Sequence, residues 1–308
     1  MKFSITIPAY KQRYLSEAIE SCLAQTYKDF EVIIVDDASP EDLKSVVDKF
    51  DDARIRYYRN EKNCGALNVV DNWNICLGYV QGDYVICMGD DDRLLPNCLE
   101  EYVNLIKAYP EVDVFHGWTE IIDEESNVVD INEPRPLKES VYSLIYYRLK
   151  GRQQYIGDFL YKTETLRKNG GYYYLPLAWG SDDITAFIAA ESHGIVNSQK
   201  VLFQYRKNRY TISKSSNCKI QIQSFLEFKQ WVIAFLDKRQ KGASDIYYVK
   251  IKGELKHLFK KKMLGTIGKD LSSNGLKNIL FWHANAKKYN LSSIDVVSVI
   301  LKYLNSRR

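Results

Sequence analysis

Three consecutive aspartates, Asp90, Asp91 and Asp92, follow an apolar segment with the pattern of a buried strand, residues 84–88. Carboxylates packed this closely repel one another, and burial raises the pKa of whichever is least solvated. A bound cation explains such a cluster best, and a divalent metal that carries a phosphorylated ligand fits well. A solvated turn rich in aspartate is the alternative, and the triplet alone does not separate the two interpretations.

Two further acidic pairs occur at comparable positions. Asp36 and Asp37 follow the all-apolar residues 32–35, and Asp182 and Asp183 open a predicted helix that ends near residue 193. Ligands of open α/β sheets bind at the carboxyl ends of the strands, so we expect all three acidic sites on one edge of the sheet. One site could accept hydrogen bonds from a base or ribose, one could hold a metal against a diphosphate, and one could act as a general base.

The first hundred residues alternate strand and helix patterns. The expected strands are residues 3–8, 31–36, 55–58 and 84–88, and the expected helices are 14–25, 39–50, 66–79 and 97–109. Ser39 is the predicted N-cap of the second helix, with Pro40 at its first position. Apolar strands separated by helices predict an α/β fold with a mainly parallel sheet and helices on both faces. The sequence contains neither G-x-G-x-x-G nor G-x-x-x-x-G-K-[ST], which excludes a dinucleotide fingerprint and a P-loop.

The composition changes near residue 215. Residues 219–308 contain 18 Lys and Arg against 6 Asp and Glu, a net charge of +12, whereas the first 218 residues carry −8. We therefore predict a nucleotide-binding type of domain at 1–214 and a basic, mainly helical region at 215–308. The basic region could face a membrane or an acidic partner, or its lysines could be solvated faces of helices that cover the first domain.

Cysteine usage and hydropathy indicate the compartment. Six scattered cysteines without a C-x-x-C pair suggest reduced, intracellular thiols. The sequence has no signal-peptide pattern and no apolar run of 18 or more residues. We expect a cytoplasmic protein, peripheral at the inner face of the membrane if the basic region binds lipid, and no nucleic-acid partner.

The order of motifs resembles the glycosyltransferase family 2 enzymes, inverting nucleotide-sugar transferases of the GT-A fold. Residues 5–10 (ITIPAY) match, and so do residues 21–39, with Gln-Thr-Tyr before the second strand and Val-Asp-Asp-x-Ser after it. The resemblance covers roughly residues 3–213 and continues through further motifs: Asn63-x-Gly65, Gly82-Asp83-Tyr84-Val85, Asp91-Asp92-x-x-x-Pro96, Gly170-Gly171-Tyr172 and Gly180-Ser181-Asp182.

The resemblance implies a nucleotide pocket after the first two strands. Asp37 would accept from the base, while Asp36 would help to shape the strand end; helix capping is the alternative for this pair. The residues expected to bind the nucleotide are Pro8, Ala9, Tyr10, Asp36, Asp37, Asn63, Gly65 and Asp90.

The resemblance also implies a site for Mn²⁺ or Mg²⁺. Asp91 matches the last Asp of the family's D-x-D motif, which binds the metal and through it the donor diphosphate; Asp92 is a supporting ligand, and Gly89 replaces the first Asp. Asn208 stands where relatives have a His. Either Asn208 ligates the metal, or Arg206 and Arg209, with Lys207 between them, neutralise the diphosphate; ordinary surface charges are the third reading.

Asp182 matches the Asp of the family's Gly-Glu-Asp motif, in which a carboxylate deprotonates the acceptor hydroxyl. Ser181 replaces the usual Glu, Asp183 is the competing base, and an N-cap is the structural alternative. The implied reaction is a single in-line displacement that inverts the anomeric configuration and needs no nucleophilic side chain.

We expect the protein to transfer a sugar from a nucleoside-diphosphate sugar to a hydroxyl of a glycan or lipid-linked acceptor. The preferred donor is a UDP sugar, and the expected process is the synthesis of a surface polysaccharide, glycan or glycolipid. The alternative is an inactive GT-A-shaped scaffold or assembly protein, suggested by Gly89, Ser181 and Asn208. A sugar nucleotidyltransferase would normally begin with a Gly-rich loop, which this sequence lacks.

Overall fold

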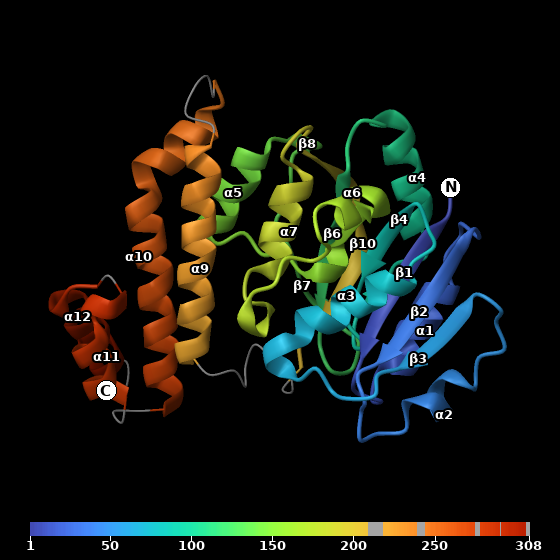
Figure 1. Cartoon of the computed structure of the whole chain (residues 1–308), viewed down its shortest axis with the longest axis horizontal. Helices are drawn as coiled ribbons and strands as arrows, with labels where there is room; N and C mark the ends of the chain where they lie inside the picture. Colours follow the sequence, from blue (N-terminus) through green and yellow to red (C-terminus); the bar gives the residue numbers. More distant parts are fainter. Residues whose placement is uncertain (209–217, 239–243, 275–277, 290, 306–308) are drawn as a thin grey trace.

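The centre of the molecule is a mixed β-sheet (Figure 1). The computed structural model describes residues 1–308 apart from 209–217, 239–243, 275–277, 290 and 306–308. The described strands run in the order β3-β2-β1-β4-β9-β6-β10-β5, with β7 paired to β6 and β8 to β10. Their bounds are β1 (Phe3–Ala9), β2 (Phe30–Asp36), β3 (Ile55–Arg59), β4 (Tyr84–Cys87), β5 (Arg93–Leu94), β6 (Val114–Ile122), β7 (Val128–Ile131), β8 (Lys138–Glu139), β9 (Phe159–Lys162) and β10 (Ile195–Arg206).

Strand direction divides the sheet into two parts. Strands β1 to β4 pair in parallel, as the alternating pattern predicts. Strand β9 is antiparallel to both β4 and β6, and β6 then pairs in parallel with β10. The carboxyl ends of β1, β2 and β4 therefore lie on one edge, which brings the loops after residues 9, 36 and 87 together.

Helices cover both faces of the sheet, because apolar side chains point alternately to each side of the buried strands. In β2, Val32 and Ile34 belong to the core under α1, α2 and α4, whereas Ile33 and Val35 belong to the core under α3, α5 and α7. The helices are α1 (Leu15–Leu23), α2 (Leu43–Val47), α3 (Val69–Tyr79), α4 (Cys98–Ala108), α5 (Val141–Lys150), α6 (Thr163–Lys168), α7 (Ser181–Ala189), α9 (Cys218–Asp237), α10 (Ile246–Asn274), α11 (Ile279–Asn285) and α12 (Ser293–Asn305), with short 3₁₀ turns η1 (Ala66–Asn68), η2 (Ile156–Asp158), η3 (Pro176–Ala178) and η5 (Lys287–Tyr289).

The C-terminal helices add a layer outside α5 and α7 (Figure 1). Their apolar side chains continue the core of that face, from Ile33 in the sheet to Val296 in α12. Phe228 of α9 lies 6.2 Å from Phe187 of α7, ring centre to ring centre. The predicted boundary between 214 and 215 falls in a part of the chain outside the described residues.

One local expectation was wrong. Helix α2 begins after Asp42, whose side chain accepts from the Ser45 amide, and not after Ser39. The Ser39 hydroxyl instead donates to the Tyr10 carbonyl (2.6 Å), which joins the β1 and β2 loops. In the described ranges, no helix combines the length and the apolar character that crossing a bilayer requires.

Candidate active site

A cavity of about 570 Å³ opens at the carboxyl ends of β1, β2 and β4. Its wall combines segments that are far apart in the sequence, from the β1 loop to the last residues of β10. The lining residues are Pro8, Tyr10, Lys11, Asp37, Asn63, Gly65, Ala66, Val69, Asn72, Trp73, Gly89, Asp90, Asp91, Asp92, Gln154, Tyr155, Ile156, Leu177, Ala178, Asp182 and Tyr205. All three acidic sites singled out in the sequence thus contribute a side chain to one cavity.

Asp37 is fixed at the cavity wall by the loop after β3. Its Oδ1 accepts from the Cys64 amide (2.9 Å) and from Asn60 Nδ2 (2.8 Å). Asn63 Nδ2 donates to the Asp37 carbonyl (2.6 Å). Gly65 follows with φ +78°, a backbone conformation that glycine adopts without strain. These contacts gather four of the predicted nucleotide residues, Pro8, Asp37, Asn63 and Gly65, with Tyr10 beside them.

Asp36 and Ala9 lie behind this wall and do not line the cavity. The Asp36 carboxylate accepts from the Ser39 amide (2.7 Å) and the Tyr57 hydroxyl (2.6 Å), and it is paired with Arg59. The Ala9 carbonyl accepts from the Asp37 amide (2.9 Å). Both residues therefore build the strand ends, and their positions do not match the direct nucleotide contact predicted for them.

Each aspartate of the 90–92 cluster is held by a different segment. Asp90 Oδ2 accepts from the amides of Tyr10 and Lys11, both at 2.7 Å. Asp92 Oδ1 accepts from the Arg206 amide (2.9 Å). Asp91 accepts from the side-chain nitrogen of Asn208. The structure thus brings the β1 loop, the acidic cluster and the end of β10 together around one point.

Burial is the main cause of a raised pKa for all three carboxyls. For Asp90, burial and then repulsion from Asp91 raise the pKa to about 6. The pKa of Asp92 is raised well above its usual range, by burial first and by repulsion from Asp91 second. Burial also raises the pKa of Asp91, which the charge of Lys11 partly offsets. The protein therefore leaves negative charge here that a cation would stabilise.

Two of these carboxylates approach Gly89 closely. A Cβ at residue 89 would lie 2.9 Å from Asp92 Oδ2 and 3.0 Å from Asp91 Oδ1. Within the described residues, no three His, Cys, Asp or Glu side chains form a preassembled metal group. Mg²⁺ and Mn²⁺ accept one or two carboxylates together with phosphate oxygens and water. The chemistry and spacing of Asp91 and Asp92 therefore fit such an ion.

Arg206 is fully buried and does not line the cavity. Its guanidinium lies 4.1 Å above the ring of Tyr14. It donates to the carbonyls of Asp91 (2.8 Å) and Asp123 (3.1 Å), to Ser126 Oγ (2.8 Å) and to Glu17 Oε2 (2.8 Å). The diphosphate contact predicted for Arg206 does not match this position, because its donors are used inside the protein.

The cation that does line the cavity beside the acidic cluster is Lys11, which the sequence analysis missed. Its place directly after the matched residues 5–10 was the available signal. Asn208 is buried and positions Asp91 through its amide nitrogen without lining the cavity. Arg209 lies outside the described residues.

Asp182 and Asp183 have different surroundings. Asp182 lines the cavity, and burial, followed by repulsion from Asp183, raises its pKa to about 8. Asp183 is buried, and its Oδ1 accepts from Arg148 Nε and Gln154 Nε2, both at 2.6 Å. Asp182 is therefore the member of the pair that a bound molecule can reach.

The loop that leads to Asp182 has an unusual backbone. Leu177 and Ala178 line the cavity with φ of +60° and +52°, and Gly180 follows with φ +98°. Positive φ in a residue other than glycine is strained and persists only where surrounding contacts hold it. Ser181 Oγ accepts from the Leu175 amide (2.9 Å), and Ser224 Oγ of α9 donates to the Pro176 carbonyl (2.8 Å). The first C-terminal helix thus supports the loop before Asp182.

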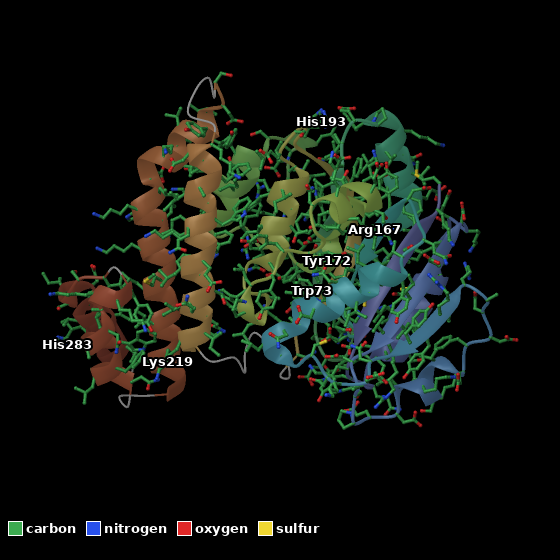
Figure 2. The ribbon with its side chains drawn as sticks, viewed as in Figure 1. Trp73, Arg167, Tyr172, His193, Lys219 and His283 are labelled. Atoms are coloured by element: carbon green, nitrogen blue, oxygen red, sulfur yellow. The ribbon has the colours of Figure 1, made fainter. Side chains whose placement is uncertain are left out.

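Aromatic rings form part of the remaining wall. Tyr155 and Tyr205 are stacked, with centroids 3.8 Å apart and planes inclined by 12°. Trp73 packs edge-on against Tyr172 at 5.8 Å, and Figure 2 shows the two side chains in the middle of the molecule. Trp73 is largely buried, as expected for a core residue, although one part of it lines the cavity. The sequence analysis missed the tyrosine pair because its partners are fifty residues apart.

A sequence profile described as Glycosyl transferase family 2 matches residues 4–166, more than half of the chain. The chain belongs to this family. The chain is 30% identical over 168 residues to an uncharacterized glycosyltransferase of Rickettsia typhi, and the match covers 52% of this chain and 51% of that protein. It is 39% identical over 101 residues to a Campylobacter jejuni protein named GalNAc(5)-diNAcBac-PP-undecaprenol beta-1,3-glucosyltransferase, covering 32% of each. The matches thus span about half or less of these relatives.

Solved structures share the fold of this chain. Staphylococcus aureus TarS residues 1–349 in complex with UDP-GlcNAc superposes with a TM-score of 0.60 at 18% identity, covering 99% of this chain and 92% of that one. A mannosyltransferase from Pyrobaculum calidifontis in complex with GDP-Man and Mn²⁺ gives 0.56 at 14% identity, covering 99% and 88%. These similarities confirm the predicted fold class, a mixed sheet with helices on both faces and added C-terminal helices.

Proposed function

We propose that the protein is an inverting glycosyltransferase that moves a sugar from a nucleoside-diphosphate sugar to a hydroxyl of a glycan or lipid-linked acceptor. One observation carries the proposal: Asp182 lines the same cavity as Asp37 and the Asp90–Asp92 cluster. A base, a nucleotide-binding carboxylate and a charged diphosphate site within one cavity are the parts that a single displacement needs.

The donor occupies the side of the cavity made by β1, β2 and the loop after β3. Asp37 accepts from the base, and Pro8, Tyr10, Asn63 and Gly65 form the surrounding wall. Among the fold relatives, one structure is a complex with UDP-GlcNAc and another a complex with GDP-Man, so uracil and guanine are both candidate bases. We favour a UDP sugar as the first donor to test.

Asp91 and Asp92 would hold Mn²⁺ or Mg²⁺ beside Gly89. Asn208 orients the Asp91 carboxylate through a hydrogen bond. When bound, the metal neutralises the diphosphate and stabilises charge on the leaving group. Lys11 adds a second positive charge at the same wall. Asp90 holds the Tyr10–Lys11 loop against the cluster, which keeps that lysine beside the diphosphate.

Asp182 takes the proton of the acceptor hydroxyl as its oxygen attacks the anomeric carbon and the nucleoside diphosphate leaves. A pKa near 8 makes Asp182 a better proton acceptor than an ordinary aspartate. Asp183, in the first turn of α7, is paired with Arg148. Gln154, Tyr155, Tyr205 and Leu177 form the acceptor side of the cavity.

The acceptor class follows from chemistry and from the relatives. Stacked tyrosines at a cavity wall suit the apolar face of a sugar ring. The Campylobacter relative carries an undecaprenol-linked glycan in its name, which supports a lipid-linked acceptor and peripheral contact with the inner face of a membrane.

The experiment is a thermal-shift panel of UDP, GDP, CDP and ADP, each with and without Mn²⁺. We expect one nucleotide to raise the melting temperature in the presence of metal, and Asp91→Asn to lose that shift. No metal-dependent shift with any nucleotide would contradict the enzyme proposal. Nucleotide binding without release of nucleoside diphosphate from any sugar donor would favour the inactive scaffold instead.

A further inference from the structure

Helix α12 carries aliphatic side chains on the side that faces away from the protein. Ile294 is 81% exposed, Val297 42% and Leu301 54%. Their spacing of three and then four residues places them along one side of the helix. Val296 and Val299 occupy the opposite side and pack into the core. We call Ile294, Val297 and Leu301 the α12 face.

The fold does not need this face to hold α11 and α12 in place. Lys260 Nζ of α10 is 2.7 Å from Asp295 Oδ1 of α12. Buried Trp282 of α11 donates to Asp270 Oδ2 of α10 at 2.6 Å. Lys219 lies 3.8 Å from the ring of Phe281, and Figure 2 shows it beside the helix that carries His283. These contacts hold the inner sides of both helices, and the α12 face is exposed to solvent.

Cations lie on the elements next to α12. Lys287 and Lys288 are exposed on η5, which precedes α12 in the chain. Lys256 and Lys261 are exposed on α10, the helix whose Lys260 pairs with Asp295 of α12. The aliphatic side chains of the α12 face thus belong to a region of net charge +12.

We propose that the α12 face docks on an anionic lipid surface. Aliphatic side chains enter the boundary between headgroups and acyl chains while flanking lysines meet anionic headgroups. Charge complementarity favours lipid over a second copy of the chain, because two such faces would bring their lysines together.

Docking would serve the acceptor side of the active site, a consequence that rests on the proposed function. The cavity residues Leu177 and Ala178 belong to η3, and Ser224 of α9 bonds to Pro176 in that turn. Helix α9 packs on α10, and α10 packs on α12. The docking face is thus connected through packed helices to the wall that receives a lipid-linked acceptor.

The test is cosedimentation of the full chain with vesicles of phosphatidylglycerol and phosphatidylcholine in equal parts, or of phosphatidylcholine alone. We expect binding to the anionic vesicles that weakens with salt. The double substitution Val297→Ser and Leu301→Ser should reduce the partition coefficient by about tenfold or more. Lys287→Glu with Lys288→Glu should reduce it by about tenfold through charge alone.

The control variants make the same kinds of substitution at exposed positions outside the C-terminal helices. Val128→Ser with Val129→Ser alters exposed aliphatic residues of β7, and Lys107→Glu with Lys168→Glu alters exposed lysines on α4 and α6. The aliphatic control should leave vesicle binding unchanged, and the lysine control should reduce it less than Lys287→Glu with Lys288→Glu does.

Three results would overturn the inference: no binding by the wild type, equal binding by the α12-face variants, or a wild-type dimer that Val297→Ser with Leu301→Ser dissociates. UDP binding with Mn²⁺, measured on the same proteins, should not change in any variant. A wild type that does not bind UDP would count against the proposed function and not against docking of the α12 face.

Discussion

Gly89 stands where the D-x-D motif of the family has its first aspartate. This glycine lies close to carboxylate oxygens of Asp91 and Asp92. Any side chain at this position would have to displace Asp91 or Asp92. The departure from D-x-D is therefore compatible with metal binding through the two later aspartates.

Gly89→Ala should weaken Mn²⁺-dependent nucleotide binding by about tenfold or more, because the new methyl group occupies the space between the two carboxylates. Isothermal titration of UDP with Mn²⁺ measures the change. Gly78→Ala is the matched control, since a Cβ at that α3 position meets nothing within 4 Å. Unchanged affinity in Gly89→Ala would place the metal elsewhere.

The raised carboxyl pKa values predict that the metal-free protein loses stability as pH rises. Asp90, with a pKa of about 6, and Asp182, with a pKa of about 8, bind protons in the folded state that the unfolded chain has already released. Where the folded state binds more protons, the free energy of unfolding falls with rising pH, by about 1.4 kcal/mol per pH unit for each proton.

The pH window runs from about pH 4, near the ordinary aspartate pKa, to about pH 8. Urea unfolding at several pH values measures the dependence. Asp182→Asn should flatten the upper part of the dependence, between pH 6 and pH 8. A wild-type stability that rises across this range would show that these carboxyls are ionised in the folded protein.

At the scale of elements, Arg206 joins the end of β10 to α1, to the loop after β4 and to the loop after β6. Arg206→Lys keeps the charge but cannot reproduce four directed donors. We expect a loss of about 3 kcal/mol in unfolding free energy, because buried acceptors lose their hydrogen-bond donors. Lys207→Arg at the neighbouring exposed position is the control, and equal stability of the two variants would contradict this role.

The sequence predicts the elements better than it predicts their ends. The strands β1 to β4 follow from uninterrupted apolar runs, and the direction of their pairing follows from the helices between them. The start of α2 did not follow, because both Ser39 and Asp42 can cap a helix and only the bond from Ser39 to Tyr10 decides between them. Capping preferences are local, whereas this choice depends on β1.

Some site residues could be predicted from the sequence, and others could not. Pro8, Asp37, Asp91 and Asp182 lie in motifs at strand and helix ends, so their meeting in one cavity could be predicted. The Arg206 side chain points into the protein, where it donates to Glu17 and Ser126. Both partners are distant in sequence, so no local pattern predicts this orientation. Tyr155 and Tyr205 were missed for the same reason.

At the scale of the whole molecule, the C-terminal helices share a core with the sheet and support the loop before Asp182. Phe228 of α9 is central to this contact, because its ring lies against Gly180 and Phe187. Phe228→Ala should therefore lower the unfolding free energy by about 3–5 kcal/mol. It should also slow transfer, since the strained turn η3 loses its support.

Ile246→Ala is the control for Phe228→Ala, since Ile246 is largely exposed at the start of α10. Urea unfolding followed by circular dichroism gives both values. A single transition in the wild type is expected from the shared core. Two separate transitions, with Phe228→Ala affecting only one, would mean that the helices fold as an independent unit.

The most direct test of Asp182 as the general base compares the wild type with Asp182→Asn in two assays. One measures donor binding, and the other measures release of nucleoside diphosphate from a sugar nucleotide, with acceptor or water. We expect unchanged UDP affinity in the presence of Mn²⁺ and a loss of turnover of about 10²-fold or more, the usual contribution of a general base. Turnover by Asp182→Asn at the wild-type rate, or loss of donor binding in that variant, would contradict this role of Asp182.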